Sequence, residues 1–145
     1  MKFRFSLEPV LKLRKHEEKT EQFKLGKALG KKVELQRARQ NLVQQLKKMA
    51  VFLESQTTGH IMVWRRYYSF LEQQQKMISI YDKKIEEAEK QVQIQRARLT
   101  EVNKKTQTLE KLETKEKMQL IRHLEQLDQK ANNEIAAQRF NRKRR

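Results

Sequence analysis

The sequence predicts an all-α protein, in which two long helices fold back on each other as an antiparallel coiled-coil hairpin. The first observation behind this prediction is the scarcity of helix breakers. The chain of 145 residues has three glycines and one proline, and the 86 residues from His60 to Arg145 contain neither. Sheets need turn residues about every ten positions, so this stretch favours helix. With 37% apolar and 36% charged residues, a broad globular core is not expected.

The second observation is a single convincing break, the weak helix formers and glycine of residues 55–60. Gly26 and Gly30 interrupt nothing in the apolar pattern, so we interpret them as glycines tolerated inside the first helix. We expect one domain, residues 1–145, composed of helix 1 at about 7–54, a loop at about 55–61, helix 2 at about 62–139 and a basic tail at 139–145.

The third observation is a heptad pattern on each side of the break. On each side of the break we take a ladder of positions spaced alternately by three and four residues. Nine of its fourteen positions are apolar in the first segment, and eleven of fourteen in the second. The first ladder comprises Leu7, Leu11, Arg14, Glu18, Glu21, Leu25, Ala28, Lys32, Leu35, Arg39, Leu42, Leu46, Met49 and Leu53. The second comprises Trp64, Tyr67, Leu71, Gln74, Ile78, Tyr81, Ile85, Ala88, Val92, Gln95, Leu99, Val102, Thr106 and Leu109. This spacing of 3.5 residues is typical of a left-handed coiled coil.

The short loop favours an antiparallel pairing of the two ladders. Pairing Leu53 with Trp64 makes the numbers of paired residues sum to about 117. The second helix then continues for about thirty residues, roughly 45 Å, beyond the start of the first. This overhang keeps an apolar stripe, which predicts a surface for another protein.

Charge and composition exclude several classes of function. The net charge of +16 is spread along the chain apart from its basic tail, which is typical of a solvated coiled-coil face. The positive electrostatic field of such a chain favours contact with anionic lipid or an acidic protein. Specific nucleic-acid binding is less favoured, because the tail arginines have no aromatic stacking platform among them. There are no cysteines, and the three histidines lack metal-ligand spacing. We expect no catalytic residue, metal or cofactor.

An aromatic patch follows the break. Phe70 and Met77 lie beside the ladder, one heptad apart. They either broaden the seam or form an exposed face that docks on a partner. The strip to test for docking comprises Phe70, Gln74, Met77 and Tyr81.

Three segments carry a resemblance to a known family, the FliJ proteins of the flagellar type III export apparatus. The first is Phe3-x-Phe5-x-Leu7-x-x-Val10-Leu11-x-Leu13-Arg14. The others are Trp64-x-x-Tyr67-x-x-Phe70-Leu71 and Leu127-Asp128-Gln129-Lys130-Ala131. The resemblance covers nearly the whole chain and agrees with its length, basic charge and two-helix layout.

The resemblance implies a non-enzymatic stalk, similar to the γ-subunit coiled coil of rotary ATPases. Its partners would be a hexameric export ATPase (FliI-like), the cytoplasmic domain of an export gate protein (FlhA-like) and export chaperones. The protein would be cytoplasmic, peripheral at the inner face of the cell membrane, and would serve flagellum biogenesis, motility and chemotaxis. The gate-binding strip would be Phe70, Gln74, Met77 and Tyr81. The ATPase-ring surface would be Phe3, Phe5, Leu7, Val10, Leu11, Leu120, Leu124, Leu127 and Ala131.

Three alternatives stay open from the sequence. One is the equivalent stalk of a virulence type III secretion system. Another is a basic coiled-coil protein that binds nucleic acid, whose binding would fall steeply with salt. The last is a structural coiled coil that only oligomerises.

Overall fold

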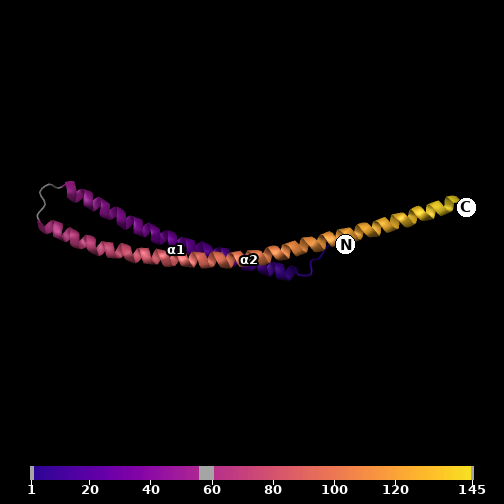
Figure 1. Cartoon of the computed structure of the whole chain (residues 1–145), viewed down its shortest axis with the longest axis horizontal. Coiled ribbons are helices and arrows are strands. Elements are labelled where there is room, and N and C mark those ends of the chain that lie inside the picture. Colours follow the sequence, from indigo (N-terminus) through magenta and orange to yellow (C-terminus); the bar gives the residue numbers. More distant parts are fainter. Residues whose placement is uncertain (1, 56–60, 145) are drawn as a thin grey trace. The chain divides into compact units, whose positions relative to one another are not determined.

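The computed structural model describes residues 2–55 and 61–144 and contains two helices there, α1 (Glu8–Ser55) and α2 (Ile61–Arg144). They pack against each other in antiparallel directions, and the described residues contain no strand (Figure 1). The predicted all-α hairpin is therefore confirmed. Most of the predicted loop, residues 56–60, lies outside the described residues.

The ends of α1 and α2 follow from local chemistry. The amide of Leu11 donates to the carbonyl of Leu7 at 2.9 Å, which closes the first turn of α1. Pro9 is tolerated in that turn because its missing N–H would have no partner inside the helix. α2 continues to Arg144, past the expected end near residue 139, and its last turn is basic. Cations there favour the negative end of the helix dipole.

Contacts divide the chain into two compact units. The first unit comprises residues 2–19 with 101–144, and the second comprises residues 20–55 with 61–100. In the second unit α1 and α2 face each other along a seam, in which Val92 is fully buried and Leu46 and Ala88 are nearly so. In the first unit Phe5, Leu11 and Thr106 are buried. The single domain expected from the sequence stays a prediction.

Most of the predicted seam positions are covered in the structure. All fourteen ladder residues of α2 are buried or half-buried. Twelve of the fourteen residues of the first ladder are also buried or half-buried. The exceptions are Leu7 and Met49, which are 36% and 42% exposed. The seam predicted from the heptad pattern is thereby confirmed.

Polar ladder positions form cross-seam contacts in the second unit. The amide of Gln95 donates to the carboxylate of Glu21, Lys32 pairs with Glu89, and Arg39 donates to Asp82 at 2.5 Å. The residue numbers of these three pairs sum to 116, 121 and 121, close to the predicted register. Since a shift of either helix would separate these partners, the pairs favour one alignment.

Candidate partner-binding surfaces

Four surfaces that could engage other molecules lie on the two helices. The second unit carries the strip at the edge of the seam and an exposed apolar end beside residues 56–60. The first unit carries the apolar stripe of α2 beyond Leu120 and the basic last turn. Each surface is described by itself below.

The strip lies partly in the seam and partly outside it. Phe70 and Met77 are 39% and 42% exposed, whereas Gln74 and Tyr81 are half-buried. Phe70 also lines a shallow apolar hollow between α1 and α2, together with Phe52 and Tyr67. The Nζ atom of Lys84 lies 5.9 Å from the centre of the Tyr81 ring. The exposed edge therefore presents two apolar side chains one heptad apart, Phe70 and Met77.

The apolar end of the second unit was not singled out from the sequence. Val51 and Phe52 in the last turns of α1 are 66% and 60% exposed, and Ile61 and Met62 in the first turn of α2 are 74% and 72% exposed. The signal was present in the sequence as four consecutive apolar residues, Ile61 to Trp64, directly after the break. The heptad pattern selects one residue in each turn, so of these four residues it includes only Trp64.

Aromatic rings follow this apolar end along α2. Trp64 meets Tyr67 edge to face, with ring centres 6.2 Å apart, and Tyr68 lies 5.7 Å from Tyr67. The ring of Tyr68 is 61% exposed. Basic side chains lie close by in sequence, Lys47 and Lys48 on α1 and Arg65 and Arg66 on α2. The end of this unit thus combines exposed aliphatic, aromatic and cationic groups.

The C-terminal part of α2 has no covered side chain after Leu120. Every described residue from Ile121 to Arg144 is exposed. The apolar stripe continues there, with Leu124, Leu127 and Ile135 at 39%, 48% and 49% exposed. An exposed stripe at helical spacing is suited to bind a groove or a second helix.

The N-terminal residues of the predicted ring surface differ in accessibility. Phe5 and Leu11 are each 5% exposed, Phe3 is half-buried, and Leu7 and Val10 are 36% and 38% exposed. Phe5 and Leu11 are therefore packed within the first unit. Leu7 and Val10, in contrast, remain accessible at the surface of this region.

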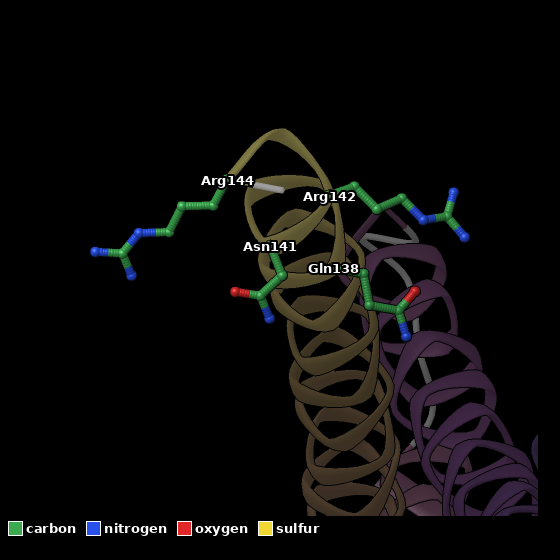
Figure 2. Close-up of a pocket in the computed structure, with 4 residues that line it drawn as sticks. All are labelled: Gln138, Asn141, Arg142 and Arg144. Carbon is green, nitrogen blue, oxygen red and sulfur yellow. The ribbon is translucent and has the colours of Figure 1, made fainter.

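The last turn of α2 carries the basic tail. Figure 2 shows Gln138, Asn141, Arg142 and Arg144 around a shallow hollow, with the two arginines extending to opposite sides. The guanidinium of Arg144 lies 5.7 Å from the ring centre of Phe140. The divergent side chains do not converge on a single ligand position, so the tail contributes charge rather than a built site.

One carboxylate at the seam has a shifted pKa. Hydrogen bonds from Lys32 and then from Gln93 lower the pKa of Glu89 below its ordinary value of 4.5. The Gln93 amide donates to Glu89 at 2.9 Å from the next turn of the same helix. Glu89 is thus held ionised as part of a structural pair, and its position in the seam assigns it no chemistry on a substrate.

The described residues show neither a metal centre nor a membrane span. In residues 2–55 and 61–144, no group of three or more His, Asp or Glu side chains is placed to hold a metal ion. Over the same ranges, neither helix has an apolar stretch long enough to cross a bilayer.

Comparison with known proteins gives one match. A family model described as FliJ, flagellar FliJ protein, matches residues 2–145. No curated protein matches the chain, and no solved structure matches it.

Proposed function

Because this chain belongs to the FliJ family and is thereby a component of the flagellar export apparatus, we propose that it acts as a stalk between the export ATPase and the export gate. The family is a non-catalytic part of that apparatus. In this proposal α2 binds a hexameric export ATPase and stimulates it. The edge strip binds the cytoplasmic domain of the gate protein. Escort of export chaperones and a cytoplasmic location at the inner face of the membrane belong to the same proposal.

The observation that supports the ATPase contact best is the exposed end of α2. Twenty-four consecutive residues, Ile121 to Arg144, stay exposed although an apolar stripe runs through them. A helix with such a stripe is stabilised when a partner covers it. The proposed contact residues are Leu124, Leu127 and Ala131, flanked by Leu120, with Leu7 and Val10 as accessible N-terminal residues. Phe5 and Leu11 are buried and would act by packing the N-terminal segment, whereas the half-buried Phe3 stays among the proposed contact residues.

The mechanism proposed for stimulation is asymmetric contact. A single helical stalk cannot touch the six subunits of a ring equivalently. Subunits that make more contacts would be biased towards one conformational state, and the coupling free energy would appear as a change in hydrolysis rate.

The first experiment measures ATP hydrolysis by the cognate export ATPase, with and without this chain, at near-physiological salt. The full chain should stimulate hydrolysis, and a chain that ends at Leu120 should not. A matched control carries exposed charge reversals in the same segment but off the stripe, such as Glu125→Lys, and should stimulate normally. Stimulation by the truncated chain would refute the proposed contact. No stimulation by the full chain of an ATPase shown to form active rings would refute the stalk function.

A second experiment tests the gate contact. Phe70→Ala with Met77→Ala should weaken binding of the gate protein's cytoplasmic domain at least about tenfold, because partly exposed apolar anchors carry much of the energy of such interfaces. Helix content should not change. The matched control is Ile80→Ala with Ile94→Ala, two residues on α2 that are 45% and 47% exposed. Equal loss in both variants, or loss of helix in the first, would refute a specific strip.

A further inference from the structure

We propose that the apolar end of the second unit binds the surface of an anionic lipid bilayer directly. This lipid-binding tip comprises Val51, Phe52, Ile61, Met62 and Val63, with Lys47, Lys48, Arg65 and Arg66 around it. The proposal is independent of the ATPase and gate contacts proposed above. It places a lipid contact in the chain itself rather than in its protein partners.

The first argument is exposure. Ile61 and Met62 are the two most exposed large apolar side chains of the described residues, at 74% and 72%. Val51 and Phe52 come from the other helix and are 66% and 60% exposed. Phe52 of α1 and Val63 of α2 line one apolar hollow between the helices, so exposed apolar side chains of the two helix ends meet at this end of the unit. Exposing such a patch to water costs free energy, and contact with a lipid interface removes that cost.

The second argument is the kind of apolar side chain. Trp64, Tyr67 and Tyr68 lie on the next two turns of α2, with ring centres 5.7–6.3 Å apart. Trp and Tyr are enriched at the level of lipid headgroups, because their rings have an apolar body and a polar edge. Tyr68 is the accessible ring of the three, at 61% exposed, and Trp64 and Tyr67 are half-buried beside it. An exposed ring of this kind next to exposed aliphatic side chains is suited to the headgroup region of a bilayer.

The third argument is charge complementarity. Residues 47–55 and 61–70 contain Lys47, Lys48, Arg65 and Arg66 against a single carboxylate, Glu54. Cationic side chains beside an apolar patch are attracted by the negative potential of anionic lipids, and the long stems of Lys and Arg allow their charges to stay in the headgroup layer. An acidic protein would satisfy these charges but would not require the exposed aliphatic residues beside them.

A second copy of the chain is the other occupant to consider. The apolar residues exposed at the tip are few and are flanked by four like charges. Two such tips placed against each other would bring eight cations together with only two carboxylates, the Glu54 of each copy. A bilayer surface supplies both the apolar layer and the opposite charge.

The test uses the full chain and vesicles of phosphatidylcholine with 30% phosphatidylglycerol. Trp64 is the only tryptophan of the chain, so its fluorescence reports on this end alone. We expect co-flotation with these vesicles, a blue shift of Trp64 emission and quenching by brominated acyl chains. Vesicles of phosphatidylcholine alone should bind at least about tenfold more weakly.

Two variants with matched controls locate the contact. Ile61→Ser with Met62→Ser should weaken vesicle binding about tenfold or more and abolish the blue shift, with helix content retained because both residues are exposed. The control, Leu13→Ser with Phe23→Ser, removes two apolar side chains of α1 that are 55% and 64% exposed and should bind normally. Arg65→Gln with Arg66→Gln should lower affinity several-fold, and its control is Lys104→Gln with Lys105→Gln.

Several outcomes would overturn the proposal. Flotation without a change in Trp64 emission would mean that the basic chain adsorbs elsewhere. Equal loss of binding in both serine variants would exclude a specific tip. If sedimentation showed that the wild type is a dimer and the tip variant a monomer, the tip would be an interface between copies. Failure to stimulate the ATPase would not affect this result, so the two proposals are tested separately.

Discussion

One helix of this protein has two contrasting parts. Between Ala88 and Thr106, α2 contains four of the seven buried residues of the described chain. From Ile121 onward every described residue of the same helix is exposed. Both parts are rich in Lys, Glu and Gln and both carry an apolar stripe. The difference shows that an apolar stripe at helical spacing marks the face of a helix that can be covered. The length of α1, which is shorter than α2, decides which part of that face is covered by this chain itself.

The two parts should differ most in their response to a buried charge. Val92→Asp introduces a carboxylate where the native side chain is fully buried, and should lower the free energy of unfolding by more than about 3 kcal/mol. Leu124→Asp, at a position 39% exposed, should change it by less than about 0.5 kcal/mol. Urea unfolding followed by circular dichroism measures both. Similar losses at the two positions would mean that the end of α2 is covered by an association not present in this chain alone.

A smaller effect is expected from the glycines of α1. A Cβ atom at Gly26 or Gly30 would meet nothing within 4 Å. Gly26→Ala and Gly30→Ala should therefore each stabilise the hairpin by about 0.5–1 kcal/mol, through helix propensity and a less flexible unfolded chain.

A substitution in the exposed end of α2 provides the comparison for the stabilisation expected from the two glycine replacements. Asn132→Ala improves helix propensity at an exposed position of α2. It should raise local helix content but leave the midpoint of the cooperative transition unchanged, because no packed side chain couples that segment to the seam. A matching rise in midpoint would show that the segment unfolds together with the seam.

The smallest effect concerns pH. The folded-state pKa of Glu89 lies below its ordinary value of 4.5, mainly because of the hydrogen bond from Lys32. Its contribution to stability is therefore complete above pH 4.5 and is lost as the pH falls through the lower folded-state pKa. Glu89→Gln should remove this part of the acid dependence of unfolding. The control Glu125→Gln, in the exposed segment, should retain the wild-type profile, and identical profiles in both variants would contradict a role for the pair.

The sequence was sufficient for much of this structure. The absence of Gly and Pro after residue 59 fixes a long second helix, because nothing in that stretch favours a turn. Heptad counting identified the seam, since each covered position must recur every 3.5 residues to face the same partner. The register followed from a short break, and the pairs Glu21–Gln95 and Arg39–Asp82 lie close to it. The family resemblance could also be recognised from Phe3 to Ala131.

Tertiary packing decided what the pattern could not express. Sequence spacing treats Leu7 and Leu11 alike, yet only Leu11 is buried, and Leu7 lies just before the first residue of α1. In the sequence, a polar ladder residue such as Lys32 interrupts the apolar pattern. In the structure it forms an ion pair with Glu89 of the other helix. The exposed tip at Phe52 and Ile61 arises only when two helix ends come together. Periodicity determines which face of each helix is apolar, whereas the pairing of the helices determines which apolar residues remain for other molecules.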